Sequence, residues 1–305
     1  MVRSLTTALG CVGVAVALLV AGCGTDSQPA DPTSVEQAPN WPGHLTDFRF
    51  RWTVPDGIDL TTGWAVPLRA YLESWLLTYF TDDLRSVYPG FDRATRSSVT
   101  EGALERSAAP YVRRSVRGYR GSSPVPRDSV VVGNEELHIL GLEPLPDGFR
   151  ALVCESQFDV YTRVPDASVY RPVSIEHAKN AERADSTNML VWRIEFTDRH
   201  PSADGAPGSP SEPQEGPLPA PTEDVFGPWF VTGAGPVSAW STVDHPGLAP
   251  DEAKQRFFEA RAQEDRLRQQ CLDRLGIPPE ERMRLAATEL TSPPAVAPAA
   301  PGWPD

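Results

Sequence analysis

The amino-acid sequence predicts an α+β fold, in which a curved antiparallel sheet packs on a long N-terminal helix and C-terminal helices follow. Three observations predict this class. Residues 66–87 carry a helical apolar stripe, residues 128–164 have the pattern of two strands joined by a turn, and a second long helical pattern starts at residue 250. Strands that follow one another without a helix between them favour antiparallel pairing over βαβ units.

The first strand and the long helix have the plainest patterns. Residues 47–53, DFRFRWT, alternate aromatic and arginine side chains, as a half-buried strand does. Over residues 66–87 a wide apolar stripe predicts a helix that packs against something large, and Pro89-Gly90 ends it. A weaker helical pattern covers residues 100–118. The stripe consists of Leu68, Leu72, Trp75, Leu76, Tyr79 and Phe80.

The central strands form a predicted hairpin whose turn is residues 144–148, PLPDG. In its second strand, Cys154 shares the apolar face with Leu152, Phe158 and Val160. The opposite face carries Glu155, Gln157 and Asp159, which line a cavity if the sheet curves that way and otherwise face solvent. Residues 188–198 and 227–235 are two further predicted strands.

Two proline-rich segments are expected to lack fixed structure. The segment 199–226 holds many prolines and few bulky apolar groups, so we predict a disordered loop there. The C-terminal segment 291–305 is a Pro/Ala-rich tail. Between them, helices are expected over residues 250–290, and the domain as a whole over residues 44–290. Trp41 and Trp303 lie in the tether described below and in the tail, where they are available to dock on the domain or on a partner.

The N-terminus has the features of a secretory signal peptide over residues 1–22. Arg3 is its only charge, residues 11–20 are uniformly apolar, and small residues follow. The letters VAGC at 20–23 resemble the bacterial lipoprotein box. That resemblance implies that the thiol of Cys23 takes a diacylglyceryl group and that the signal is cut before it. A cleaved signal with a coincidental cysteine is the alternative.

A flexible tether is predicted for residues 23–43, which are mostly small, polar and proline residues. A flexible chain of that length has an end-to-end reach of roughly 25 Å, so the domain would lie close to the extracytoplasmic face of the cell membrane. The formal charge of −13 argues against nucleic acid as a partner. The chain has two lysines against 26 arginines and is rich in Ala and Pro. With the lipoprotein box, this composition resembles that of an actinobacterial, mycobacterial-type secreted lipoprotein.

The remaining cysteines predict a disulfide. Cys11 leaves with the signal and Cys23 is lipidated, so Cys154 and Cys271 remain as a pair outside the cytosol. Cys271 falls on the apolar stripe of its helix, and both side chains are therefore expected to face a core. Two free buried thiols are the alternative.

The element order over residues 64–240 resembles the cystatin-like folds, in particular the nuclear-transport-factor-like cone, in which a curved antiparallel sheet wraps a long helix. Members of that fold include enzymes with a cavity, subunits of envelope complexes and non-catalytic binding modules. The resemblance therefore does not select one function.

No motif commits the sequence to a reaction, and no cofactor or metal site is expected. The Gly-Ala-Gly of residues 233–235 is interpreted as a turn or bulge and not as a dinucleotide loop, because Pro236 lacks a backbone N–H. His138 is the only histidine inside a predicted strand. With Asp159 or Glu195 it is the candidate acid/base group of a cavity enzyme, and a histidine satisfied within its strand is the alternative.

Residues 111–121, YVRRSVRGYRG, form a basic patch on an acidic chain. Its arginines suit anionic lipid headgroups or phosphorylated wall polymers, and a solvated helix face is the alternative. The patch consists of Arg113, Arg114, Arg117 and Arg120.

We therefore expect a membrane-anchored extracytoplasmic lipoprotein that acts as a non-enzymatic binding or accessory module for an envelope protein, lipid or glycan. Two alternatives remain. One is a small hydrolase or isomerase with a cone-shaped cavity, and the other is a subunit of an envelope transport or secretion complex.

Overall fold

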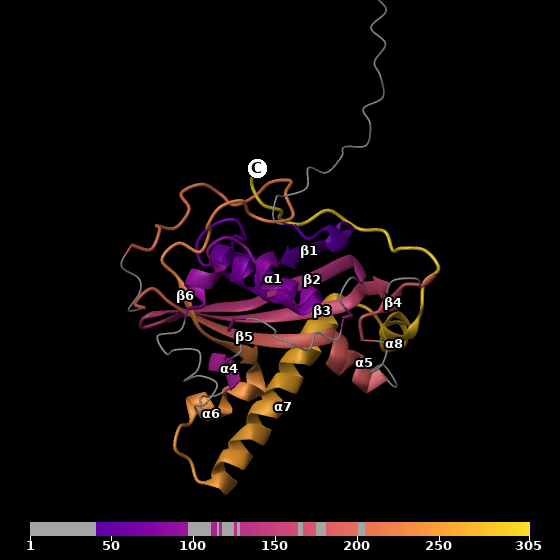
Figure 1. Ribbon diagram of the computed structural model, residues 1–305. Coiled ribbons are helices and arrows are strands. Elements are labelled where there is room, and N and C mark those ends of the chain that lie inside the picture. Colours follow the sequence, from indigo (N-terminus) through magenta and orange to yellow (C-terminus); the bar gives the residue numbers. More distant parts are fainter. Residues whose placement is uncertain are drawn as a thin grey trace, which may run out of the picture. The chain divides into compact units, whose positions relative to one another are not determined.

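The chain forms a mixed six-stranded sheet with helices on both faces (Figure 1). The computed structural model describes residues 41–96, 111–114, 116–117, 125–126, 129–163, 167–174, 181–200 and 205–305. The predicted signal peptide and the lipidation site Cys23 lie outside these residues, as does the tether up to residue 40.

The strands are ordered β1-β2-β3-β5-β6, and β4 pairs with β3 beside this path. Except for β1 and β2, the paired strands are antiparallel. The strands are β1 (Phe48–Thr53), β2 (Val130–Leu145), β3 (Gly148–Arg163), β4 (Arg171–Pro172), β5 (Met189–Thr197) and β6 (Phe230–Pro236).

The α+β class is confirmed, but the expectation of a wholly antiparallel sheet is wrong at its first strand. β1 runs parallel to β2, with Phe48 opposite Gly133 and Thr53 opposite His138. Parallel neighbours need a long crossover connection, and the chain between β1 and β2 supplies one that contains a helix. The alternating pattern of residues 47–53 identifies a strand and carries no information on the direction of its neighbour.

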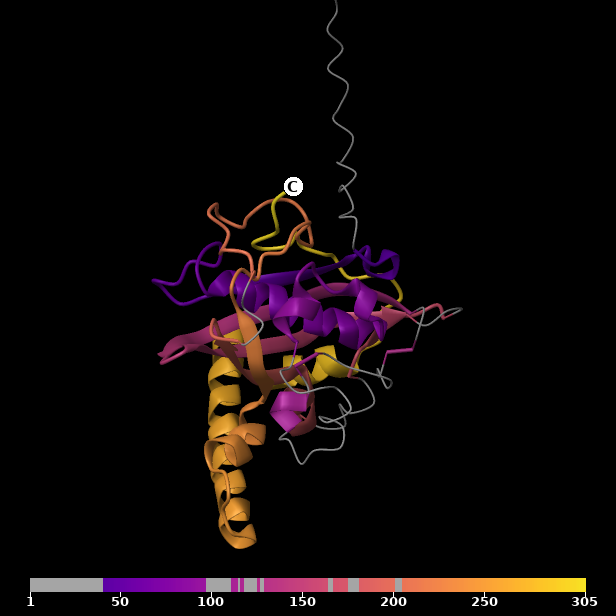
Figure 2. The same cartoon turned by 60° about the vertical axis from the view of Figure 1, so that its left-hand side comes forward.

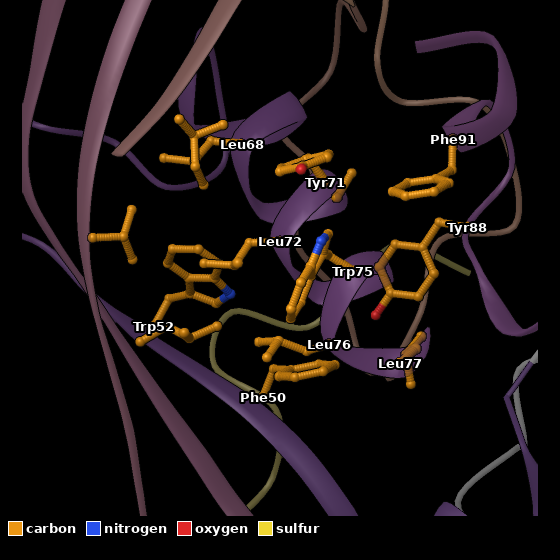
Figure 3. Close-up of a cluster of buried hydrophobic side chains, with 14 of the residues drawn as sticks. Phe50, Trp52, Leu68, Tyr71, Leu72, Trp75, Leu76, Leu77, Tyr88 and Phe91 are labelled. Atoms are coloured by element: carbon orange, nitrogen blue, oxygen red, sulfur yellow. The ribbon is translucent and has the colours of Figure 1, made fainter. Parts of the chain in front are cut away.

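Helix α1 (Ala65–Thr81) lies on one face of the sheet and is buried almost throughout. Figure 3 shows Trp52 of β1 and Tyr88 from the segment after the helix gathered around Leu72 and Trp75 of α1. The helix ends at Asp82, whose φ of 51° is left-handed. It is therefore shorter than the predicted 66–87, and a 3-10 turn (Leu84–Ser86) and the short helix α2 (Phe91–Ala94) follow it.

The opposite face carries the later helices (Figures 1 and 2). Helix α7 (Pro250–Leu275) begins with a proline and is followed by Gly276, whose φ of 69° suits glycine. Its C-terminal part packs on the sheet, and the rest of the helix extends away from it. The helices beyond α2 are α4 (Tyr111–Arg114), α5 (Ala181–Asn188), α6 (Ser241–Asp244), α7 (Pro250–Leu275) and α8 (Pro279–Ala287), with 3-10 turns at Gly43–Leu45 and Val237–Trp240.

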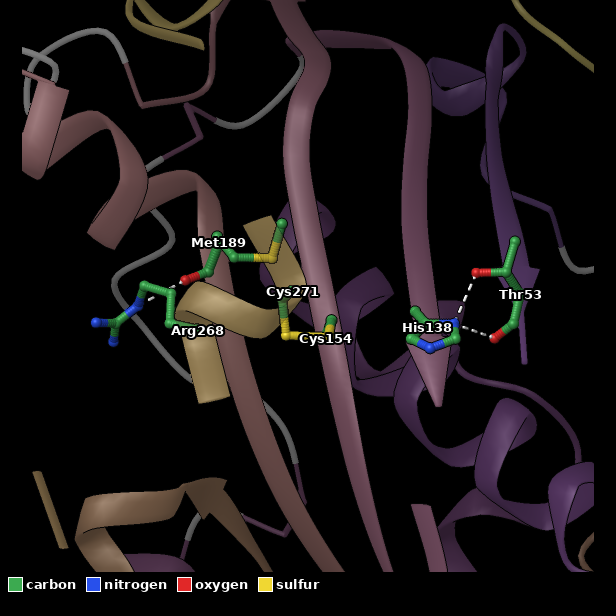
Figure 4. The surroundings of a disulfide bond; sticks show 6 residues. All are labelled: Thr53, His138, Cys154, Met189, Arg268 and Cys271. Carbon is green, nitrogen blue, oxygen red and sulfur yellow. Dashed lines mark hydrogen bonds between the residues drawn. A yellow bond between two sulfur atoms is a disulfide. The ribbon is translucent and has the colours of Figure 1, made fainter. Parts of the chain in front are cut away.

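The predicted disulfide is present. Cys154 on β3 is bonded to Cys271 on α7, with their Cα atoms 5.8 Å apart (Figure 4). Both cysteines are buried in a small apolar cluster with Met189 and Leu272. The bond therefore joins the centre of the sheet to the end of the longest helix.

Neither proline-rich segment matches the prediction of missing structure. Residues 205–226 pack against the α1 side of the core, with Leu218 and Phe226 buried. In the tail, Trp303 is 1% exposed and exchanges backbone hydrogen bonds of 3.0 and 2.8 Å with Leu218. Trp41 is buried too, so the fold begins before the end of the predicted tether. In each segment one or two large apolar residues suffice to dock a chain otherwise poor in them.

A buried pair of charges on α1 holds the tail in place. The guanidinium of Arg69 donates to the carbonyl oxygens of Pro301 and Gly302, at 2.9 and 3.1 Å, and lies 4.0 Å from the Trp303 ring centre. It donates also to the carbonyl oxygens of Leu60 and Gln214. These donations satisfy carbonyls that a proline-rich chain cannot pair in regular structure.

The partner of Arg69 is Glu73, one helical turn later, with 3.9 Å between the nearest side-chain atoms. The carboxylate accepts hydrogen bonds from Trp52 (2.6 Å), Tyr88 (2.7 Å) and Trp303 (2.9 Å). Burial raises the pKa of Glu73, and Arg69 and these three donors oppose that shift. Glu73 therefore joins the first strand, the core and the last residues of the chain.

Trp303→Ala should lower the free energy of unfolding by about 3–5 kcal/mol, because it removes a buried ring and one of the donors to Glu73. Urea unfolding of the purified protein measures the change. Phe258→Ala is the matched control, since Phe258 is 58% exposed, and should stay within about 0.5 kcal/mol of wild type. Equal effects of the two variants would contradict the docking of the tail.

Replacing both Cys154 and Cys271 by alanine should lower the free energy of unfolding by about 4–5 kcal/mol, since the bond closes a loop of 117 residues in the unfolded chain. The measurement is urea unfolding with and without a reducing agent. Reduction should destabilise wild type by a similar amount and leave the alanine variant unchanged. A wild type that is indifferent to reduction would show that the bond contributes nothing.

Candidate functional site

The candidate acid/base residues of the sequence do not meet in one site. His138 lies on β2 opposite Cys154, whereas Asp159 is paired with Asn134, four residues along the same strand. That spacing corresponds to about 13 Å. Glu195 lies on β5 opposite Arg150, which is again four residues from Cys154 along β3.

His138 lines a cavity of about 360 Å³ on the α7 side of the sheet, beside the disulfide, Ser156 and Arg274. Its Nδ1 lies 2.9 Å from both the hydroxyl and the carbonyl oxygen of Thr53 (Figure 4). Burial and the nearby Arg274 lower the pKa of His138 to about 4. The imidazole is therefore neutral near pH 7 and is hydrogen-bonded to Thr53 of the neighbouring β1, which favours the structural interpretation of this residue.

The two carboxylates of the predicted trio have other partners. Glu195 forms ion pairs of 2.7 Å with both Arg150 and Arg193. Asp159 is partly buried, and burial together with the charge of Glu136 raises its pKa to about 6. In the described part of the chain, neither Glu195 nor Asp159 forms a hydrogen bond or an ion pair with His138.

A different cavity, of about 220 Å³, lies between α1 and the sheet. Trp75 and Tyr79 of α1 and Trp192 of β5 supply its aromatic lining, and the Trp75 and Trp192 ring centres are 4.6 Å apart. Among the described lining residues the carboxyl group is that of Glu155 on β3, with Gln157 next to it on the same face. Aliphatic and hydroxyl side chains complete the lining, namely Leu76, Val173, Leu190, Ser174 and Thr187.

Behind this lining, Glu155 forms a buried carboxyl pair with Glu135 of β2. The Gln157 amide donates to Glu155 at 2.9 Å and to Glu135 at 3.3 Å, and so bridges the two groups. The Trp192 indole also donates to Glu155. Two carboxyl groups in direct contact and out of water cannot both ionise, so one proton is held between them.

The pair titrates unequally. Burial raises the pKa of Glu155 to about 7, while its hydrogen bonds to Trp192, Glu135 and Gln157 oppose the shift. Burial and the neighbouring Glu155 raise the pKa of Glu135 well above its usual range. Near neutral pH the pair therefore shares one proton, and the direction of both shifts disfavours a second negative charge in it.

The sequence pointed to part of this site. Glu155 and Gln157 were expected on the strand face opposite Cys154, and the structure places them on the α1 face together with the buried Val153. Asp159 does not share that face, because a β-bulge in β3 opposite Asn134–Glu136 changes the alternation. Glu135 had no signal of its own, since two adjacent glutamates in a strand do not reveal which one is buried.

The predicted basic patch is described only in part. Arg113 is exposed, and Arg117 forms a 2.8 Å ion pair with Asp92. Arg120 and the side chain of Arg114 lie outside the described residues. The role of the patch stays a prediction.

The described residues contain neither a metal-binding cluster nor a membrane-spanning helix. No group of three or more His, Cys, Asp or Glu side chains in the described part of the chain is arranged to hold a metal ion. No helix within it has both the length and the apolar character that crossing a membrane requires.

Wild type should lose stability relative to Glu155→Gln as the pH rises from about 4.5 to about 7. The folded state holds the Glu155 proton more tightly than the unfolded chain, so the wild-type free energy of unfolding falls across this window, by roughly 3 kcal/mol. Urea unfolding at several pH values gives the difference. Glu143→Gln, at an exposed carboxylate, is the matched control and should follow wild type. A constant difference between wild type and Glu155→Gln would contradict the burial of an ionisable group there.

Comparison with protein-family models, with characterised proteins and with solved structures found no significant match to this chain.

Proposed function

We propose that this protein is a lipid-anchored extracytoplasmic module of the cell envelope that binds a small ligand in the cavity between α1 and the sheet. The observation that carries the proposal is the lining of that cavity, in which aromatic side chains surround one ionisable carboxyl group. Ligand sites typically combine a mostly apolar lining with a few placed polar groups.

The membrane anchor is supported by the lipoprotein-type sequence around Cys23 and by the polar chain that follows it. The Cys154–Cys271 disulfide is consistent with this location, because such bonds persist in oxidising compartments outside the cytosol. Two acyl chains or more on one residue give stable membrane attachment, which a single chain does not.

The fold resemblance is part of the proposal. A long helix on one face of the sheet, with a cavity between them, is the arrangement expected of a nuclear-transport-factor-like cone. The bulges within the β2–β3 pair support a curved sheet, because a bulge bends its strand. The parallel β1 and the helices after residue 250 are additions to that scheme.

A non-enzymatic role is favoured because the cavity lining includes one acid and no histidine, lysine or cysteine among the described residues. One observation favours the enzyme alternative, namely the pKa of Glu155 near 7, which suits a general acid or base such as that of an isomerase. Such an enzyme would use Glu155 in place of the predicted His138, Asp159 and Glu195.

A role as subunit of an envelope complex has a separate observation in its favour. The exposed large apolar side chains of the described chain are Phe257, Phe258 and Met283, and the first two are adjacent on the part of α7 that extends from the sheet. They are fewer than a large protein interface requires, so we rank this alternative below the binding module.

Cys23→Ala should abolish lipid labelling and release the protein from membranes when the full chain is expressed in an actinobacterial host. The thiol is the atom to which the resemblance assigns the acyl chains, so its removal leaves nothing to label. Metabolic labelling with an alkyne fatty acid, followed by membrane fractionation, measures both effects. Cys11→Ala is the matched control and should behave as wild type. Persistent labelling of Cys23→Ala, or its retention in membranes at mature length, would overturn the anchor.

A further inference from the structure

We propose that the cavity between α1 and the sheet binds a primary amine carried on a small apolar body, with the ammonium group at Glu155 and Gln157. This inference rests on the proposed function, since it names the class of ligand that the cavity takes. It is carried by the size of the cavity, by its hydrogen-bonding capacity and by its aromatic lining.

The size of the cavity limits the ligand. A buried apolar cavity of about 150 Å³ holds a benzene molecule, so the 220 Å³ here suits a ligand of roughly nine non-hydrogen atoms. A whole acyl chain of a membrane lipid or a sugar chain exceeds this volume. A single ring with a short side chain fits the space.

At the polar end of the cavity, the side-chain N–H donors of Trp192 and Gln157 are already used by the two carboxyl groups. The Trp192 indole N–H donates to Glu155, and the Gln157 amide donates to both carboxyl groups. The side-chain oxygen of Gln157 accepts no hydrogen bond from a described residue. A ligand that brings N–H donors therefore completes the hydrogen bonding here, whereas a ligand that brings only acceptors does not.

Charge favours a cation over a neutral donor. The described lining holds no Lys, Arg or His to neutralise an anion. Ionisation of Glu155 places a negative charge on the wall of the cavity. An ammonium beside a buried carboxylate forms a charge-assisted hydrogen bond, which is stronger than a neutral one. A buried carboxylate without a counter-ion is unfavourable in free energy, and an ammonium ligand would supply that counter-ion.

The aromatic lining adds to this preference. Trp75 packs against Trp192, and Tyr79 stacks on Trp75 with 6.4 Å between ring centres. Aromatic faces attract a cation through their quadrupole and attract the apolar body of the ligand through burial. A neutral alcohol of the same shape gains only the second of these contributions.

The carboxyl pair couples binding to protonation. In the empty protein Glu155 is only partly ionised near pH 7, because its pKa is about 7. A cationic ligand favours its ionised form, so a proton leaves Glu155 for solvent as the ammonium enters. The affinity for an amine should accordingly rise with pH through this range, and the affinity for a neutral ligand should not.

The test uses the full mature chain purified in detergent and three probes, measured by isothermal titration calorimetry near neutral pH. The probes are 2-phenylethylammonium, the neutral 2-phenylethanol of nearly equal size, and the anion 3-phenylpropanoate. We expect the ammonium to bind at least about tenfold more tightly than the alcohol, and the anion not to bind. Titrations in buffers of different protonation enthalpy should show release of a proton with the ammonium alone.

Three variants locate the effect. Glu155→Gln should weaken the ammonium about tenfold or more and leave the alcohol unchanged, whereas Leu190→Phe, which fills the cavity, should weaken both. Glu143→Gln, the same change at an exposed site, should match wild type. The pH dependence in wild type needs no variant and decides the matter if Glu155→Gln does not fold.

The outcomes separate the two proposals. Binding of the alcohol as tightly as the ammonium, with both weakened by Leu190→Phe, would overturn the amine and keep the cavity as a ligand site. Preference for the anion, or an ammonium affinity independent of pH, would overturn the amine as well. Failure of every probe to bind wild type would overturn both the amine and the proposed role of the cavity.

Discussion

The structure depends on one buried ion pair, Arg69 and Glu73, on the face of α1 that is turned away from water. Both charges are hydrogen-bonded by groups from several distant segments, which is the condition under which a buried pair is tolerated, although Nε of Arg69 has no hydrogen-bond partner among the described residues. Arg69 collects the carbonyls of two proline-rich stretches, and Glu73 collects indole and phenol donors from the first strand, the core and the tail. Loss of one partner would leave an uncompensated charge inside the core.

The sheet separates the molecule into two regions with different roles. On the α7 side, the disulfide joins a small apolar cluster to the long helix, and His138 is held by Thr53 at the edge of this region. On the α1 side, the main core surrounds the ion pair in the first half of the helix and leaves a small cavity beside its second half. The carboxyl pair Glu135–Glu155 lies where the packed core gives way to this cavity. Rigid packing on both faces of β3 therefore fixes Glu155 and Gln157 in place.

Patterns in the sequence predict the helices and strands better than they predict how these elements pair and pack. The β2–β3 hairpin, the disulfide and the α+β class follow from local alternation, turn residues and the count of cysteines. The direction of β1 does not, because strand alternation is the same in parallel and antiparallel pairs. Composition does not predict the order of the proline-rich segments because it averages over residues, whereas a few buried side chains such as Trp303 and Leu218, together with hydrogen bonds from Arg69, dock them.

The candidate site shows the same limit in a sharper form. Alternation along β3 puts Glu155 and Gln157 on one face of the strand, but it does not decide between a cavity and solvent, so their burial does not follow from the sequence. Asp159 was assigned to that face as well, and a single bulge in β3 moved it to the other. The contact of Glu135 with Glu155 depends on the pairing of β2 with β3, which the sequence pattern does not specify residue by residue. Contacts between strands distant in sequence are what a local pattern does not contain.

The C-terminal tail has a further consequence for the first strand. β1 is an edge strand, and Ala300 forms a parallel bridge with Arg51 along its otherwise open side, where the Trp52 amide donates to the Ala300 carbonyl. Unpaired strand edges are templates on which other chains add and aggregate. The backbone around Ala300 thus covers part of the edge of β1, and a protease that removed these residues would expose that edge to other chains.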